Sequence, residues 1–416
     1  MKAKLIIALF TFASISQLSA QQRCSSAAYQ QEELKNNPAQ VKILQTIEAF
    51  TNEQLKNRTA TSRTEETIIR IPVVVHVLYH TQDEKISDAR IINQIEALNK
   101  YFRRRNGDTM NTPVYFRQLA ADCEIEFQLA ISDPRKRSTT GIIRKYTPIT
   151  KWKTDDQMKF SSSMGDDAWD TKSYLNIWVC SLDRFAGYST IPGGDETKDG
   201  VVISNSAFGT ANGAAGYDMG KTAVHEVGHW LNLKHLWGDE NCGDDGVSDT
   251  PKQATYTVGC PTTTRITCGN NPYGDMYMNY MDYTNDACIN MFTQGQKARM
   301  RALFANGAVR SSILSSNGLS TPQTFESPLP TEDPKWLHPQ LYPNPAINEV
   351  NLDLTYDTRW IGKTIFVTNL QGQNVMNVLI TSKNSKINLS RLQAGIYFIA
   401  AKKDDGESIK ERFIKL

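Results

Sequence analysis

The chain has 416 residues, of which 40% are hydrophobic and 22% are charged, and its formal net charge is +2. This length allows more than one domain, and the composition is that of an ordinary globular protein. The nearly neutral charge argues against a nucleic-acid partner. The short basic run Arg103–Arg105 follows an expected helix, so we interpret it as a solvated helix end and not as a phosphate-binding patch.

The first 20 residues have the organisation of a secretory signal peptide. Two lysines precede an apolar stretch from Leu5 to Ala13, and small residues end the segment at Ala20. A membrane anchor is the alternative, but the apolar run is shorter than the roughly 18 to 20 residues that span a bilayer. We expect residues 1–20 to be removed and the mature protein to contain no transmembrane segment. Export brings the seven cysteines into an oxidising compartment, and an odd number leaves at least one without an internal partner.

Next comes a polar segment, from residue 21 to about residue 66, with one thinly amphipathic helix around residues 40–56. Ser87 is expected to cap a long amphipathic helix. Residues 187–192 contain Pro192, so we expect this strand at a sheet edge, where proline is tolerated. The expected strands are residues 68–78, 123–129, 175–180, 187–192 and 200–203. These elements predict an α/β (α+β) domain with a mixed, twisted sheet.

The last quarter of the chain has a different character. Five prolines between residues 322 and 339, without periodicity, predict a linker over residues 318–340. Short alternating segments then follow, with turn signals at Gly372 and Gly406. About seven short strands are expected in residues 341–416, which predicts a small β-sandwich.

A HExxH motif lies at residues 225–229. Its histidines, His225 and His229, share one helix face, so both imidazoles can bind one ion. Glu226 projects beside them, where it can polarise a water without binding the metal. His235 completes the pattern, and three of the chain's six histidines fall within eleven residues. This concentration argues against ordinary core or surface histidines and predicts a catalytic Zn²⁺ site.

The third histidine can share the ion only if the chain turns before it. In a straight helix, His235 would lie nearly two turns beyond His229, too far along the axis. The chain must therefore turn near Asn232. Because asparagine is enriched among non-glycine residues with positive φ, we predict a positive φ for Asn232.

The sequence HEVGHWLNLKHLWGD, which begins at His225, resembles the zinc-binding motif of the metzincin metallopeptidases, and within them the pappalysin (cytophagalysin-type) family. Asn232 stands where metzincins have glycine. Residues 279–283, Asn-Tyr-Met-Asp-Tyr, resemble the methionine turn of the same enzymes. The resemblance extends over about residues 69–317.

This resemblance implies a metzincin-like catalytic domain over residues 63–317 that hydrolyses peptide bonds in proteins or peptides. It implies Glu226 as general base, Met281 as a support beneath the metal, and Tyr283 as a hydrogen-bond donor to the tetrahedral intermediate. The alternatives are a surface adhesin with a structural zinc, which has four protein ligands, and a hydrolase whose third ligand is a glutamate. The position of His235 argues against the second.

The resemblance also implies two crossing disulfides, Cys242–Cys268 and Cys260–Cys288. They would restrain a long, irregular loop that has little core of its own. Cys123 and Cys180 lie on expected strands, either paired with each other or as buried thiols.

Related zymogens carry a thiol that binds the zinc, and Cys24 stands at the start of the polar segment, directly after Arg23. The resemblance therefore implies a pro-segment over residues 21–62, with Cys24 in the place of the catalytic water. A disulfide from Cys24 to Cys123 or Cys180, or no role at all, is the alternative.

Pappalysin-like enzymes often cut before basic residues, using an acid in the pocket for the residue after the scissile bond. Asp286 is the candidate for that acid, although Ala287 beside it makes the match inexact. A solvated loop aspartate is the alternative. A preference for Arg or Lys would allow the enzyme to mature itself before Arg58 or Arg63.

Residues 239–251 contain five acidic residues together with glycines, which suits Ca²⁺ or, alternatively, a solvated acidic loop. Similar pappalysins bind calcium in this region. Asp244, Asp249 and Thr250 are the candidate ligands.

Residues 341–416 resemble the type IX secretion sorting domain. The motifs are LYPNPA at residues 341–346, AGIYFI at residues 394–399, and the ending RFIKL. The resemblance implies recognition by the type IX machinery of a Gram-negative bacterium and a final location outside the cell or on its outer membrane. A carbohydrate- or surface-binding β module is the alternative.

Overall fold

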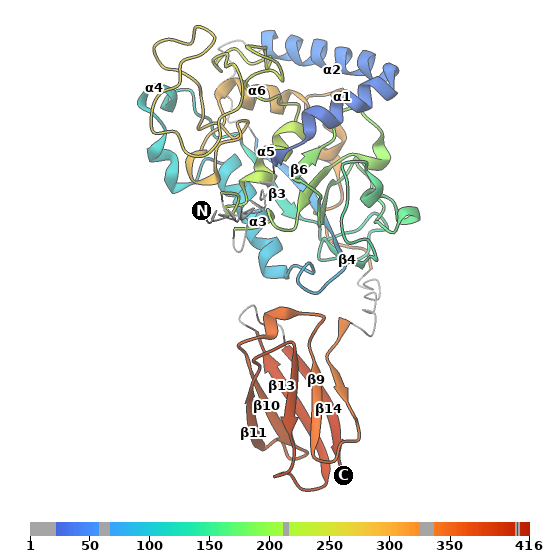
Figure 1. Cartoon of the computed structure of the whole chain (residues 1–416). Helices are drawn as coiled ribbons and strands as arrows, with labels where there is room; N and C mark the ends of the chain where they lie inside the picture. The colour runs from blue at the N-terminus through green and yellow to red at the C-terminus, as the bar shows by residue number, and fades with distance from the viewer. Residues whose placement is uncertain (1–21, 58–66, 211–215, 325–336, 404–405, 407) are drawn as a thin grey trace, which may run out of the picture.

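The computed structural model describes residues 22–57, 67–210, 216–324, 337–403, 406 and 408–416. It contains a large α/β body followed by a small β body (Figure 1). The expected signal peptide and the basic positions Arg58 and Arg63 lie outside the described residues. No described helix is long and apolar enough to cross a membrane.

A seven-stranded sheet forms the centre of the large body, in the order β1-β6-β7-β5-β2-β3, with β4 also paired to β2. Every pairing is parallel except that of β6 with β7, so the sheet is mixed, as expected. The strands are β1 (Gln22–Cys24), β2 (Ile69–Tyr79), β3 (Ile125–Leu129), β4 (Ile142–Tyr146), β5 (Leu175–Cys180), β6 (Phe185–Ser189) and β7 (Val201–Ser204).

Two helices, α3 (Asp88–Phe102) and α5 (Lys221–Trp230), share the main core with one face of this sheet. Ser87 caps α3 as predicted, because its side chain accepts a hydrogen bond from the Arg90 backbone nitrogen. β2 is buried on both faces, which explains its continuous apolar sequence. The other helices are α1 (Ser26–Asn36), α2 (Pro38–Asn57), α4 (Val114–Arg117) and α6 (Gln294–Ala302).

The sheet edge differs from the expectation in one respect. β6 ends at Ser189, so Pro192 lies beyond the strand. Among the strands that described residues after 66 form, β6 is nevertheless the last one on its side of the sheet, and β1 covers its free edge. The N-terminal segment, by which we mean residues 22–57, thus contributes a strand to the sheet and two helices, α1 and α2, that lie against the large body (Figure 1).

Seven strands form the small β body, as the alternation predicted. They make a four-stranded sheet, β11-β10-β13-β14, and a three-stranded sheet, β12-β9-β8, around one core that includes Trp360 and Phe413. The bounds are β8 (Gln340–Tyr342), β9 (Glu349–Asp353), β10 (Thr364–Asn369), β11 (Asn374–Leu379), β12 (Asn384–Asn388), β13 (Gly395–Lys402) and β14 (Ser408–Lys415).

The expected linker begins later than residue 318. The backbone nitrogen of Ile131 donates to Gly318 O, and that of Ser138 donates to Thr324 O. Residues 318–324 are therefore attached to the large body.

Candidate metal centre

Three histidines converge at the end of α5. The Nε2 atoms of His225 and His229 lie 3.1 Å apart, and His235 Nε2 lies 3.2 Å and 3.0 Å from them. The Nδ1 atom of each ring is held by a neighbour, which orients the ring. These neighbours are, in order, Tyr280 O at 2.6 Å, Leu233 O at 2.8 Å and the carboxylate of Asp239.

The chain turns where the spacing requires it. α5 ends at Trp230, and Asn232 has a φ of 66°, which confirms the predicted positive value. The backbone nitrogen of Leu233 donates to Gly228 O at 3.0 Å, so the chain folds back against the end of α5. This turn brings His235 beside the other two rings.

The donor atoms suit a transition metal ion. Cys24 Sγ lies 3.6 Å from His229 Nε2, and these four ligand atoms all lie within 4.8 Å of one another. Burial lowers the pKa of His225, and it lowers the pKa of His229 to about 3. Both rings are therefore neutral, which is the form that binds metals.

Glu226 lies beside the histidines and is itself fully buried. Its Oε2 accepts a 2.7 Å hydrogen bond from the Ser26 hydroxyl and lies 3.5 Å from Cys24 Sγ. Its Oε1 is buried and has no hydrogen-bond partner in the part of the chain that the structure describes. Burial raises the pKa of Glu226 to about 8, against the opposing effect of the Ser26 hydrogen bond. The carboxyl group can therefore both accept and release a proton near neutral pH.

Met281 and Tyr283 both lie next to the histidines. A Cβ at Gly228 would meet Met281 Sδ at 2.6 Å, so glycine at this position allows the sulfur to lie directly against α5. The Tyr283 ring is 5.0 Å from the His235 ring, and its hydroxyl donates to Cys24 O at 3.3 Å.

The N-terminal segment crosses this centre. β1 runs parallel to β6, with Cys24 opposite Gly187. The buried Arg23 donates to Thr284 O at 2.6 Å and forms a 2.8 Å ion pair with Asp286. The Asp286 side chain is fully buried, so its interpretation as a solvated loop aspartate is wrong.

The cysteines are arranged as the resemblance implied. Cys242 is bonded to Cys268, and Cys260 to Cys288. Cys24, Cys123 and Cys180 are free and buried, which excludes the alternative that Cys24 forms a disulfide with either strand cysteine.

The calcium candidates are engaged within the protein. The Asp249 carboxylate accepts a hydrogen bond from the Thr293 hydroxyl at the start of α6. Asp244 accepts from the backbone nitrogen of Gly246, and the Thr250 hydroxyl donates to Asp245.

Three contacts of the N-terminal segment were not foreseen from the sequence. The Ser26 hydroxyl donates to Glu226, and the Tyr29 hydroxyl donates to Asp156. The Glu48 carboxylate forms an ion pair with Arg299. Each is a single polar residue in a helix with little apolar surface, so no periodic pattern marks it. Arg23 had a weak signal, since it directly precedes Cys24.

Residues 159–305 match a family model described as pregnancy-associated plasma protein-A, and residues 340–415 match a secretion system C-terminal sorting domain. Extracellular metalloproteases of Verticillium alfalfae and Arthroderma gypseum are each 31% identical to the chain. The first match covers 57% of this chain and 76% of the relative, and the second covers 62% and 80%. Matches at 42% and 44% identity, to extracellular metalloproteases of Verticillium alfalfae and Pyricularia oryzae, span about half the length of those relatives.

Two solved structures from Tannerella forsythia are also similar. Mature mirolysin in complex with a cleaved peptide is 47% identical, with a TM-score of 0.59, over 60% of this chain and 96% of that one. A promirolysin mutant is 42% identical, with a TM-score of 0.66, over 72% of this chain and 100% of that one. The chain therefore belongs to the pappalysin family of metallopeptidases and ends in the sorting domain of type IX secretion.

Proposed function

We propose that the chain is a secreted zinc-dependent endopeptidase, made as a latent zymogen, that cleaves proteins or peptides before arginine or lysine. The observation that carries this proposal is the position of Glu226 beside three convergent Nε2 atoms. Three nitrogen ligands leave a position for water once Cys24 departs. The alternative, an adhesin with structural zinc, needs a fourth protein ligand that stays in the mature protein.

Each residue of the centre has a role in this proposal. Zinc held by the three histidines would supply the Lewis acidity that activates water and polarises the scissile carbonyl. Glu226 takes the proton of the attacking water and passes it to the leaving amine. The Tyr283 hydroxyl donates to Cys24 O in the latent form, so it is positioned to donate to the carbonyl oxygen of a substrate.

Latency follows from the same contacts. The N-terminal segment, as part of a pro-segment over residues 21–62, puts the Cys24 sulfur at the ligand position and the Ser26 hydroxyl on the base. β1 also occupies the β6 edge, to which an extended substrate would otherwise bind. Removing the segment frees the metal, the base and the strand edge together.

The preference for basic residues is supported by Arg23. Its guanidinium lies in a buried position on Asp286, as an arginine side chain of a substrate would. Arg58 and Arg63 are the positions before which we expect the enzyme to mature itself.

The proposal also covers the domain organisation and a second metal ion. We assign residues 63–317 to the catalytic domain and 341–416 to the sorting domain that the type IX machinery recognises. Residues 318–340 join them, and of these, residues 318–324 are hydrogen-bonded to the large body, so the linker proper begins after residue 324. Calcium is proposed as a structural ion of the loop around Asp244, Asp249 and Thr250. A rise in the thermal unfolding temperature with calcium, absent in Asp244→Asn, would support that ion, and an unchanged temperature would remove it.

One experiment tests the activity. Glu226→Ala in the full chain should retain about one zinc per molecule by metal analysis and lose cleavage of a random peptide library. Wild-type protein should cleave the library, lose activity with a chelator and regain it with zinc. Residual activity in a pure Glu226→Ala preparation would refute the role of this base, and a cleavage profile without Arg or Lys after the scissile bond would refute the specificity.

A further inference from the structure

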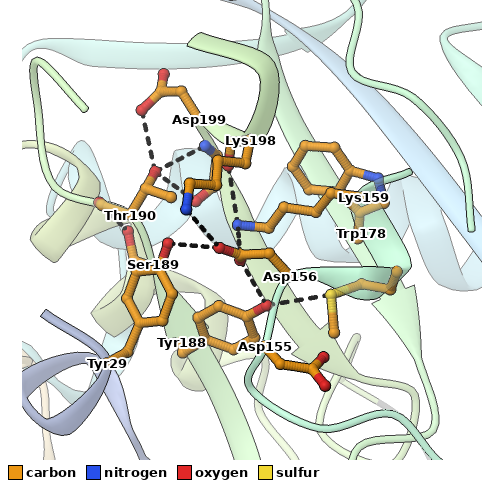
Figure 2. Close-up of polar contacts among 12 residues, drawn as sticks. Tyr29, Asp155, Asp156, Lys159, Trp178, Tyr188, Ser189, Thr190, Lys198 and Asp199 are labelled. Atoms are coloured by element: carbon orange, nitrogen blue, oxygen red, sulfur yellow. Dashed lines mark hydrogen bonds and ion pairs between the residues drawn. The ribbon is translucent and has the colours of Figure 1, made fainter. Parts of the chain in front are cut away.

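A buried polar cluster lies beside strand β6, the neighbour of β1 (Figure 2). Tyr188 of β6 pairs with Val202, which pairs with Trp178, so these three side chains share one face of the sheet. Gly187, next to Tyr188, faces the other way, and a Cβ on it would lie 2.9 Å from Glu226 Cγ. The cluster is therefore one residue along β6 from the proposed catalytic base, on the opposite face of the sheet.

Asp156 is at the centre of this cluster and is 4% exposed. Its Oδ1 forms an ion pair with the Lys159 ammonium group at 2.8 Å and accepts a hydrogen bond from the Tyr188 hydroxyl at 2.9 Å. Its Oδ2 forms an ion pair with the Lys198 ammonium group at 3.3 Å and accepts a hydrogen bond from the Tyr29 hydroxyl at 2.7 Å (Figure 2). Of these four partners, only Tyr29 belongs to the N-terminal segment.

The other partners hold the carboxylate in place. Burial opposes ionisation of Asp156, but the charge of Lys159 and the hydrogen bonds outweigh it and lower the pKa of Asp156. Burial and the Asp156 charge raise the pKa of Tyr29 and of Tyr188, so both phenols keep the protons that they donate. Lys159, which is fully buried, also donates to Lys198 O at 2.9 Å. The acceptor is therefore fixed by residues that remain when the N-terminal segment is removed.

The Tyr29 ring also has defined neighbours. Its centroid lies 5.0 Å from that of Tyr188, and Lys159 Nζ lies 5.7 Å from it. A cavity of about 210 Å³ adjoins Tyr29 and Lys198. When Tyr29 leaves, the protein keeps a ring-sized space with a charged acceptor at its end, which is the chemistry that recognises a phenol.

We propose that the space around Asp156 is a subsite of the mature enzyme that binds a phenolic side chain. Tyr29 reaches Asp156 from α1, five residues after Cys24 of β1. In a polypeptide lying along β6 in place of β1, the corresponding side chain is a tyrosine a few residues from the scissile bond. The phenol comes either from a substrate or from Tyr29 of the released N-terminal segment. This proposal rests on the proposed function, because the subsite opens only when that segment is removed.

The first arm of the test measures binding without catalysis. Glu226→Ala protein, processed in trans by trypsin, is titrated with a labelled parent peptide of residues 22–36 and with the same peptide carrying Tyr29→Phe. A hydrogen bond to a charged acceptor predicts a roughly 10- to 100-fold weaker Kd for the Tyr29→Phe peptide. A peptide with Glu32→Gln, at an exposed position, is the matched control and should bind as the parent does. Equal binding of the parent and Tyr29→Phe peptides overturns the proposal.

The second arm identifies the source of the phenol. Active processed enzyme is given peptides with tyrosine or phenylalanine at each position around one scissile bond. A preference for tyrosine at one position, abolished by Asp156→Asn, assigns the subsite to substrates. If only the binding arm distinguishes tyrosine from phenylalanine, the subsite binds Tyr29 of the released N-terminal segment. The subsite then keeps that segment bound to the enzyme as an inhibitor after cleavage.

The two arms also separate this proposal from the proposed function. An inactive wild-type protein that still binds the parent peptide more tightly than the Tyr29→Phe peptide refutes the peptidase and keeps the phenol subsite. An active enzyme that binds both peptides equally keeps the peptidase and refutes the subsite. If Asp156→Asn fails to fold, the comparison of the two peptides on protein with Asp156 intact still decides the outcome.

Discussion

The Ser26 hydroxyl donates a 2.7 Å hydrogen bond to Glu226 Oε2, so the N-terminal segment engages the proposed base as well as the metal position. Ser26→Ala removes one hydrogen bond to the buried Glu226 carboxyl group, worth about 1.5 kcal/mol. We expect the latent form of this variant to mature on the order of tenfold faster. The lag before peptidase activity, measured at several protein concentrations, checks this.

Ser25 supplies the matched control. It is a buried serine next to Ser26, and its Oγ has no hydrogen-bond partner among the described residues. Ser25→Ala should therefore mature at the wild-type rate. If both substitutions accelerate maturation equally, any weakening of the β1 contacts is enough to activate the enzyme. The hydrogen bond from Ser26 to Glu226 would then have no specific role in latency.

Asn232 tests the geometry of the third histidine. Its φ is 66°. At this φ, alanine would have a backbone strain energy of about 1–2 kcal/mol, whereas glycine would have little strain. In processed enzyme, Asn232→Ala should weaken zinc binding by about tenfold, and Asn232→Gly should stay close to wild type. Competition against a chelator of known affinity gives both constants. A glycine variant as weak as the alanine variant would place the importance of Asn232 in its side chain instead of its backbone.

The sequence predicted those parts of the structure that depend on short-range or periodic patterns. The apolar run of β2, the Ser87 cap of α3 and the turn at Asn232 each follow from residues within one element. β4 was missed because all its residues are only partly buried and their pattern is neither continuous nor alternating.

Contacts over long sequence separations could not be predicted in this way. Ser26 and Glu226 are 200 residues apart in the sequence. Nothing in the sequence around either residue indicates that the two are in contact. The pairing of the loop cysteines, and the choice of Asp286, came from the resemblance to a family and not from the chain's own pattern. Tyr29 on Asp156 had no signal at all, since a tyrosine in a polar helix is compatible with many environments.

In the small β body, Asp357 gives a pH dependence. Burial favours its neutral acid, but Arg359 and Lys403, at 2.8 Å and 2.6 Å, hold the pKa of Asp357 well below its usual range. The folded state therefore binds this proton less readily than the unfolded state. Its contribution to stability is present above about pH 4, near the unfolded pKa, and is lost as pH falls toward the folded pKa.

Asp357→Asn should therefore lower the free energy of unfolding by roughly 3 kcal/mol at pH 7, because it removes a buried carboxylate that forms ion pairs with Arg359 and Lys403. The difference from wild type should shrink as pH falls below about 4. Calorimetry over this pH range measures both. Glu349→Gln is the control, since its exposed ion pair with Lys386 is worth little.

Asp286 tests the specificity. Asp286→Asn leaves a buried guanidinium without its charged partner, so kcat/KM for peptides with arginine after the scissile bond should fall about 100-fold. Peptides with an apolar residue in that place should change little. Asp218→Asn, at an exposed acid earlier in the chain, should leave both rates unchanged.

The pattern of the loss distinguishes two roles of Asp286. Its Oδ2 also accepts hydrogen bonds from the backbone nitrogens of Met219 and Lys221, at 3.0 Å and 3.2 Å, where α5 begins. An asparagine oxygen can keep one of these bonds but cannot supply the charge. A loss confined to basic substrates therefore assigns Asp286 to recognition, whereas an equal loss for all substrates assigns it to positioning α5 and its histidines.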